Sequence, residues 1–267
     1  MPLFKYTSAK AADYLATCTL RFSPPGDFND PFDGVAITAP ILDSPAYKKA
    51  EADHLGFTAA QLAADSQLAA GVAIGRKILE EKVREGYRDE LISDLNRNFR
   101  VLCLSKASPD SAGAALMWGH YAQDPDRANK PHAGLVLEFD DSNPWFADHR
   151  GRADRAMAPV IYRATRPSIA TDQRDVIFVK SALWRYEEEV RLVRSIGQST
   201  NDLADPGTSI AQFPPQMLKT VYVGLYATSA LLEKVKAVVA GVAQLSHVRV
   251  LKITAIDADE YKLAVAT

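Results

Sequence analysis

Residues 100–105 read Arg-Val-Leu-Cys-Leu-Ser, a run of apolar residues that is typical of a β-strand. The run comes directly after residues 46–98, where Ala, Leu, Glu and Lys dominate and apolar residues recur at helical intervals. The change from a helical to a strand pattern at this point predicts an α+β fold. We expect a mixed or antiparallel sheet as the core, with residues 46–98 as a helical insertion or lobe.

Strands and helices interleave on both sides of this boundary, without the regular spacing of βαβ units. Strands are expected over residues 3–6, 19–22, 133–139, 159–163, 188–194, 220–225, 248–253 and 261–265. Helices are expected over residues 9–16, 112–122, 175–183 and 229–242, and a polar loop over residues 199–215. No internal repeat is visible, so we expect residues 1–267 to form one domain.

The composition is that of an ordinary globular protein, with 47% hydrophobic residues and a net charge of −2. A disordered chain would be less hydrophobic and more charged. A nucleic-acid-binding domain is normally basic, so the charge disfavours nucleic acid as a partner, although a local basic patch is still allowed. The first residues lack the pattern of a signal peptide, and no apolar stretch approaches the roughly 20 residues that span a bilayer. We therefore expect a cytoplasmic protein without membrane contact.

The usual catalytic and metal-binding motifs are missing from the sequence. There is no Gly-x-Ser-x-Gly, no His-Glu-x-x-His and no Gly-x-Gly-x-x-Gly. The five histidines lack a recognisable metal spacing, so no metal site is predicted. Cys18 and Cys103 stand far apart in apolar surroundings, which indicates small core residues.

Two clusters of aromatic and polar residues could carry function. In the first, Phe28-Asn29-Asp30-Pro31-Phe32-Asp33, Asn29 and Asp30 either make local turns while the phenylalanines anchor the loop, or line a pocket. In the second, Met117-Trp118-Gly119-His120-Tyr121, the aromatic residues either form an apolar helix face or stack against a planar ring of a ligand. Both interpretations of each cluster stay open.

A third cluster covers residues 180–191 and is rich in charge. On a strand over residues 188–194, Glu187, Glu189 and Arg191 would point to one side and Val190 to the other, toward the core. The charged side then either lines a cleft or forms an exposed strand with salt bridges. Glu189 beside Arg191 should remain ionised at neutral pH, because the opposite charge favours the carboxylate.

The order of these clusters resembles the bacterial family described as domain of unknown function 2971. The resemblance rests on Leu3-Phe4-Lys5-Tyr6, Leu20-Arg21-Phe22-Ser23, the first cluster, Cys103-Leu104-Ser105, the second cluster with residues 134–140, the third cluster, and Val221-Tyr222-Val223-Gly224-Leu225. It covers nearly the whole chain, and the stretch between Tyr121 and Gly134 is longer than the family pattern. The family implies no activity.

The chain also resembles, at the level of the fold, ADP-ribosyltransferase-like proteins. That resemblance implies a site for NAD⁺ or another small nucleotide, in which a carboxylate stabilises a cationic sugar and aromatic residues hold the nicotinamide. Glu189 would be the main catalytic carboxylate and Glu187 its assistant. The ligand-binding residues would be Tyr6, Lys5, Ser105, Trp118, His120, Tyr121, Arg191, Asn29 and Asp30.

Three functions are consistent with the sequence. The first is an NAD⁺-consuming enzyme, a transferase or hydrolase, acting as a toxin or defence effector. The second is a metal-dependent nuclease that uses Glu138, Asp140 and Lys180. The third is a non-catalytic module that binds a ligand or a partner, in which the same clusters are structural. For the first hypothesis, Glu189→Gln is expected to lower activity by about 100-fold or more while the fold is retained.

Overall fold

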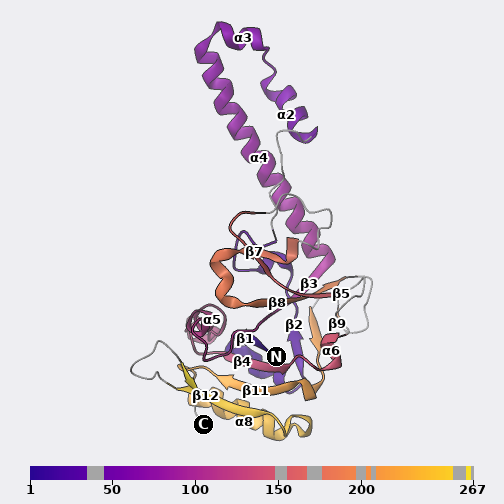
Figure 1. The fold of residues 1–267 in the computed structure, drawn as a ribbon, viewed down its shortest axis with the longest axis vertical. Helices are drawn as coiled ribbons and strands as arrows, with labels where there is room; N and C mark the ends of the chain where they lie inside the picture. The colour runs from indigo at the N-terminus through magenta and orange to yellow at the C-terminus, as the bar shows by residue number, and fades with distance from the viewer. Residues whose placement is uncertain are drawn as a thin grey trace.

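The computed structural model describes residues 1–34, 45–147, 155–166, 176–196, 203–205, 209–254 and 263–265. Its centre is an eight-stranded sheet with the order β13-β12-β11-β4-β1-β3-β8-β5 (Figure 1). The strands are β1 Pro2–Thr7, β3 Phe99–Ser105, β4 Leu135–Asp140, β5 Arg155–Pro159, β8 Glu189–Ser195, β11 Leu218–Val223, β12 Arg249–Thr254 and β13 Ala264–Val265. Neighbouring strands run antiparallel except β11 and β12, which are parallel. The protein is therefore a mixed α/β protein with a mostly antiparallel sheet.

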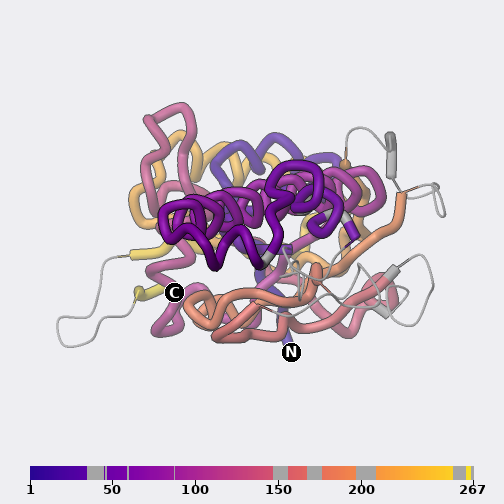
Figure 2. The backbone as a smooth tube through the Cα atoms, turned by 90° about the horizontal axis from the view of Figure 1, so that it is seen from above, coloured from indigo at the N-terminus to yellow at the C-terminus, as the bar shows by residue number. Residues whose placement is uncertain are grey.

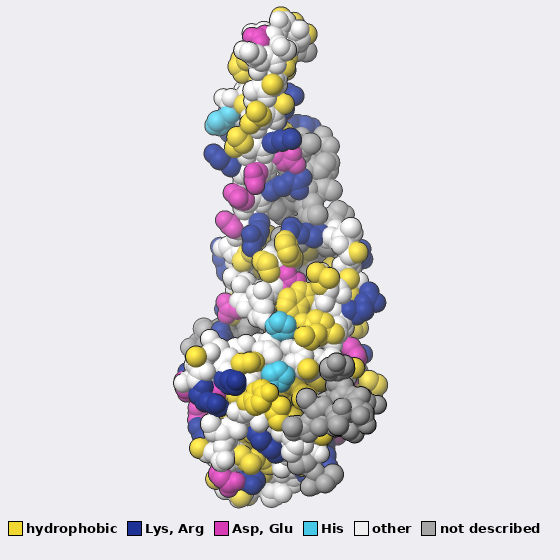
Figure 3. Space-filling view, turned by 90° about the vertical axis from the view of Figure 1, so that its left-hand side faces the viewer, with side chains coloured by type: hydrophobic (Ala, Val, Ile, Leu, Met, Phe, Trp, Pro, Cys, Tyr) yellow, Lys and Arg dark blue, Asp and Glu magenta, His cyan; other side chains and the backbone are white. Residues whose placement is uncertain are grey.

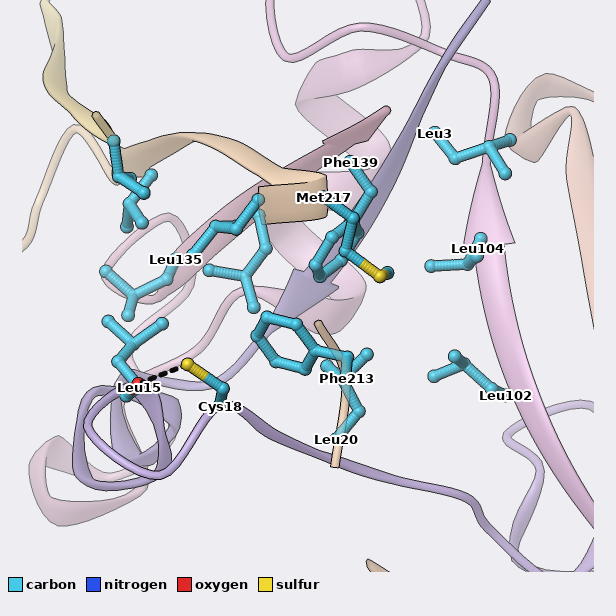
Figure 4. Close-up of a cluster of buried hydrophobic side chains, with 14 of the residues drawn as sticks. Leu3, Leu15, Cys18, Leu20, Leu102, Leu104, Leu135, Phe139, Phe213 and Met217 are labelled. Carbon is cyan, nitrogen blue, oxygen red and sulfur yellow. Dashed lines mark hydrogen bonds between the residues drawn. The ribbon is translucent and has the colours of Figure 1, made fainter. Parts of the chain in front are cut away.

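The two faces of the sheet are covered by different helices. Successive residues of β1 point to opposite faces, so that Leu3 and Phe4 belong to different hydrophobic clusters. Leu3 packs in the larger cluster, which includes residues of α1 (Ala12–Leu15) and α8 (Ser229–Gly241) and is shown in Figure 4. Phe4 packs in the smaller cluster with α5 (Ala114–Tyr121).

Two smaller sheets and several short helices complete the body. The strands β2 Thr19–Arg21, β10 Ile210–Gln212 and β9 Leu203–Asp205 form one sheet, and β6 Ile161–Arg163 with β7 Val179–Ser181 forms the other. The short helices are η1 Ala9–Ala11, η2 Pro25–Asp27, η4 Pro125–Arg127, α6 Pro144–Ala147, η5 Ala182–Glu187, η6 Pro215–Met217 and η7 Ala243–Leu245.

A helical arm projects from this body. It consists of α2 (Pro45–Leu55), α3 (Ala59–Ala64) and the 33-residue helix α4 (Ser66–Asn98) (Figures 1 and 2). Asp65 caps α4 by accepting hydrogen bonds from the backbone of Gln67 and Leu68. At the lower end, Leu91 and Leu95 are buried in a third hydrophobic cluster with β3 and β8. The helix therefore joins the body at its C-terminal end and continues directly into β3.

Most expected elements are confirmed, and the differences have physical causes. Of residues 175–183, expected as a helix, residues 176–177 are helical, residues 179–181 form β7 and residues 182–183 begin η5, while residue 175 lies outside the described residues. The strand forms here because β6 provides a parallel partner for residues 179–181. The expected loop over residues 199–215 contains β9 and β10, and β5 and α6 were not expected. Of the expected strand 261–265, residues 264–265 form β13, and residues 261–262 lie outside the described residues.

Candidate functional site

A gap in the central sheet provides the space for a site. β1 and β3 are neighbours, but their paired register contains only Phe4 with Ser105. Further along β3, Val101 exchanges two backbone hydrogen bonds with Ser23 instead of with β1. Between these two points, Lys5 Nζ donates to the Cys103 carbonyl at 3.0 Å, a group that a paired strand would otherwise satisfy. A cavity of about 170 Å³ lies in this gap, lined by residues of both strands.

A buried cluster of charged side chains forms one wall of this cavity. Its members come from four segments and are each at most 6% exposed: Asp33, Lys180, Glu187, Glu189 and Arg191. Arg191 makes paired hydrogen bonds to Asp33 at 2.8 and 2.6 Å and to Glu189 at 2.8 and 2.9 Å. Lys180 Nζ lies 2.5 Å from Glu187 and 3.2 Å from Glu189. Buried charges need such partners, because an unpaired ion in the interior is very costly.

Arg191 holds this cluster together. It also donates to the carbonyl of Ile177, and its guanidinium lies over the Phe28 ring at 4.7 Å. The planar guanidinium satisfies two carboxylates with two paired hydrogen bonds each, which a lysine at this position could not do. Asp33, Phe28 and Ile177 are thereby fixed relative to β8.

The backbone of Glu188 explains how Glu187 reaches the cluster. Glu188 adopts a left-handed conformation, with φ 44°, at the end of the 3₁₀ helix η5. Glu187 therefore belongs to η5 and not to the strand, whereas Glu189 and Arg191 do share one face of β8 as expected. Of the two alternatives for the charged side of this strand, the exposed strand is not found, because residues 189–194 of β8 are buried throughout. The salt bridges of this strand are internal.

The two glutamates have opposite electrostatic environments. Burial raises the pKa of Glu187, and Lys180 offsets this only in part. Burial would also raise the pKa of Glu189, but the positive charges of Arg191 and Lys180 outweigh it and lower that pKa to about 2. Glu189 is thus ionised at neutral pH, in agreement with the sequence-based expectation. Glu189 accepts hydrogen bonds from two cations, whereas Glu187 accepts one from Lys180 and one from the neutral Tyr121. With its raised pKa, Glu187 is therefore the carboxylate with more capacity to exchange a proton.

Hydrogen bonds from neighbouring side chains orient Glu187. Tyr121 Oη donates to its carboxylate at 2.5 Å, and Ser105 Oγ donates to its backbone carbonyl at 2.5 Å. The Tyr6 ring lines the same cavity, and its hydroxyl donates to the Ala107 carbonyl at 3.0 Å. Besides the two glutamates, several predicted site residues therefore line one cavity, namely Lys5, Tyr6, Ser105, Tyr121 and Arg191. Asn29 lines it as well, from the first cluster.

Three other predicted ligand-binding residues lie outside this cavity. Trp118 is fully buried, donates to the Pro109 carbonyl and packs edge-on against Tyr6 at 5.8 Å, so it supports Tyr6 from behind. Asp30 is buried and accepts a hydrogen bond from the backbone of Phe32, which is the structural role considered for it. His120 of α5 stacks on Tyr186 and lies tilted against Trp184. On the face of the molecule that Figure 3 shows, histidine side chains lie among hydrophobic ones.

A second cavity, of about 660 Å³, adjoins the first. The two cavities share four lining residues: Lys5, Tyr6, Ser23 and Tyr121. The second cavity is also lined by Lys10, Tyr14 and Arg21. Lys10 forms an ion pair with Asp126, and Arg21 forms one with Asp27. All four side chains are largely exposed, so these ion pairs contribute little to the free energy of folding. The second cavity therefore offers exposed cations beside the buried site.

The residues expected for a nuclease do not come together. Glu138 bonds Tyr222, and Asp140 pairs with Lys219, while Lys180 is committed to the buried cluster. Within the described residues, no group of three or more His, Cys, Asp or Glu side chains is arranged to hold a metal ion. The described part of the structure thus gives no support to a metal-dependent nuclease site at Glu138, Asp140 and Lys180.

Sequence reasoning missed several residues of the site. Asp33 was quoted as part of the first cluster, but nothing in its spacing pointed to Arg191, 158 positions away. Cys103 lines the cavity, and burial raises the pKa of its thiol, which keeps it protonated. Tyr162 Oη accepts from the backbone of Glu189 at 2.8 Å, and burial raises the pKa of Tyr162 to about 12. Contacts between residues so far apart in the chain leave no local pattern in the sequence.

Comparisons of the chain with protein-family models, curated proteins and solved structures found no match. The two resemblances described under Sequence analysis therefore stay predictions. None of the helices in the described part of the chain combines the length and the apolar composition needed to span a bilayer.

Proposed function

We propose that this protein binds NAD⁺ and cleaves the bond between its nicotinamide and ribose. The observation that carries this proposal is the charge of the buried cluster. Three carboxylates, Asp33, Glu187 and Glu189, face two cations, Lys180 and Arg191, so the cluster carries one excess negative charge when all are ionised. A cationic ligand in the adjoining cavity would balance that charge.

The pyridinium ring of NAD⁺ and the sugar cation formed during its cleavage are both positively charged, so either would balance the excess negative charge of the cluster. Inside a protein, fixed charges act more strongly than in water, so an excess carboxylate beside C1′ favours the cationic transition state. Tyr6 and Tyr121 present aromatic walls to the same cavity and suit a planar ring. The neighbouring cavity has room for the rest of a dinucleotide, with Lys10 and Arg21 available to its phosphates.

The proposed step transfers the ADP-ribosyl group from nicotinamide to water or to an acceptor. The C1′–N bond breaks, both of its electrons pass to the pyridinium nitrogen, and neutral nicotinamide leaves. A water molecule, or a hydroxyl group of an acceptor, then attacks C1′, and its proton passes to the Glu187 carboxylate. We assign Glu187 as the group that contacts the reacting atoms. Glu189, which bonds both Arg191 and Lys180 and has a lowered pKa, fixes these two cations and is a positioning residue. This reverses the order expected from the sequence.

The test is an assay for release of nicotinamide from NAD⁺. Wild-type protein is expected to form nicotinamide together with ADP-ribose or an ADP-ribosylated acceptor. Glu187→Gln keeps the shape of the side chain and should lower the rate by about 100-fold or more. Glu188→Gln is the matched control, because Glu188 is the adjacent, exposed carboxylate and should leave the rate unchanged.

Two outcomes would overturn the proposal. The first is a wild-type protein that neither binds NAD⁺ nor releases nicotinamide, which would favour a non-catalytic binding module. The second is wild-type activity in a folded Glu187→Gln variant. A parallel incubation with Mg²⁺ and DNA or RNA tests the nuclease alternative. Consumption of NAD⁺ would in turn suit a toxin or defence effector, because it depletes a cofactor that every cell needs.

A further inference from the structure

A third cavity adjoins the candidate active site at Lys180. Its volume is about 240 Å³, and Lys180 lines both it and the cavity in the sheet gap. It is lined by residues of the β6 end, the β7 region and the first cluster: Phe32, Arg163, Ala164, Thr165, Arg166, Val176, Val179, Lys180 and Ser181. Neither its arginines nor its hydroxyl groups have a part in the proposed cleavage of NAD⁺.

The charges around this cavity are of one sign. Arg163 and Arg166 line it, and among the described residues of its lining there is no carboxylate. Lys180 is paired with Glu187 and Glu189, so among the described residues of the lining the two arginines supply the remaining positive charge. Arg88 of α4 also approaches, with a hydrogen bond to the carbonyl of Pro31, the residue before Phe32. An anion in this cavity would therefore meet cations from different parts of the chain.

Arg166 is already oriented for binding. Its guanidinium lies over the Phe32 ring at 4.6 Å, which limits the freedom of a long, exposed side chain. This contact explains why Phe32 is 54% exposed instead of anchoring the loop to the core, as was expected from the sequence. The loop thus places one phenylalanine under Arg191 in the buried cluster and the other under Arg166 in this cavity.

We propose that this cavity binds a phosphoryl group. Two guanidinium groups supply planar, paired donors that match phosphate oxygens. A phosphate has more oxygens and more negative charge than a carboxylate, so it gains more from two guanidinium groups. The hydroxyl groups of Thr165 and Ser181 add two further donors at the same wall. The phosphoryl group belongs either to a free anion or to a nucleotide, and these two sources are separated by the experiment.

The test is calorimetric titration of the protein, residues 1–267, with inorganic phosphate, with adenosine 5′-monophosphate and with acetate, at constant ionic strength. We expect phosphate to bind with a Kd below about 1 mM, and acetate to bind at least 10-fold more weakly. A nucleotide as the source predicts tighter binding of the monophosphate than of phosphate, whereas a free anion predicts the reverse. Arg163→Gln and Arg166→Gln should each raise the Kd by at least 10-fold, without a change in Tm, because both side chains are exposed.

Arg185→Gln is the control, because Arg185 is an exposed arginine of η5 that does not line the cavity. The proposal is overturned if phosphate does not bind to the wild type, if acetate binds equally well, or if Arg185→Gln weakens binding as much as the other two variants. None of these measurements depends on cleavage of NAD⁺, so a failure here is distinct from a failure of the proposed enzyme activity.

Discussion

At the scale of single residues, one backbone conformation decides how the site is built. Glu188 in the left-handed region turns the chain between η5 and β8, and so brings Glu187 and Glu189 to the same lysine. Alternation along a strand predicted that Glu189 and Arg191 share a face, and this is confirmed. The same rule was extended to Glu187, just before the expected strand; Glu187 belongs to η5 and reaches Lys180 through the left-handed turn at Glu188, which has no reliable sequence signal.

The hydrogen bond from Tyr121 to Glu187 gives a test at this scale. It stabilises the ionised carboxylate, so its loss in Tyr121→Phe should raise the pKa of Glu187 further above its usual range. If Glu187 must be ionised to take a proton, the acidic limb of the pH–rate profile for nicotinamide release should move to higher pH. Tyr226→Phe serves as control, since Tyr226 lies half-exposed outside the site. A profile that does not move in Tyr121→Phe would separate Tyr121 from the function of Glu187.

At the scale of elements, the sequence predicted most strands and helices, because each carries its own periodicity. It did not predict the gap between β1 and β3, because pairing depends on segments far apart in the chain. Lys5 illustrates what the sequence can and cannot predict. Its position on a strand was evident, but its bond to the Cys103 carbonyl exists only because β1 and β3 fail to pair at that point.

The junction of α5, β1 and β4 predicts a strong effect of a small substitution. Gly134 lies where these elements meet, and a Cβ atom there would come within 2.4 Å of the Thr7 carbonyl oxygen and 2.7 Å of the Ala122 carbonyl carbon. Since both are backbone atoms, Gly134→Ala should lower the free energy of unfolding by about 2 kcal/mol or more. Gly86→Ala, in the open middle of α4, should instead raise it by up to about 1 kcal/mol. Equal urea midpoints for the two variants would contradict this.

At the scale of the whole molecule, the buried cluster ties distant segments into one folding unit. Asp33 comes from the first loop, Lys180 from β7, Glu187 from η5, and Glu189 and Arg191 from β8. Spacing along the chain cannot predict such a cluster, because its members meet only after the sheet has formed. The sequence did indicate which residues had the required chemistry, and so the candidate site was predicted in part.

The low pKa of Glu189 makes the stability of the molecule depend on pH. Its pKa falls from the usual 4.5 to about 2 on folding, so its contribution is fully present above pH 4.5 and is lost as the pH falls toward 2. The difference corresponds to about 3 kcal/mol. Glu189→Gln leaves Arg191 paired with Asp33 and Lys180 paired with Glu187, but it removes the carboxylate that both cations share. The variant should be destabilised by about 3 kcal/mol at pH 7.

Urea unfolding of the wild type and of Glu189→Gln at several pH values checks this. The difference in free energy of unfolding between the wild type and Glu189→Gln should be largest at neutral pH and should become smaller as the pH falls below 4.5. Glu188→Gln should follow the wild type throughout. A gap that stays constant with pH would show that the charge of Glu189 is not the source of the stability.

The helical arm also fixes how the molecule moves in water. A helix of 33 residues is about 50 Å long, whereas a compact chain of this length has a radius of gyration of about 18 Å. Viscous drag on the arm slows end-over-end tumbling far more than spinning about the arm, so rotational diffusion is strongly anisotropic. The molecule will therefore sediment more slowly than a sphere of its mass, and the arm will sweep a volume of solvent well beyond the body that holds the site.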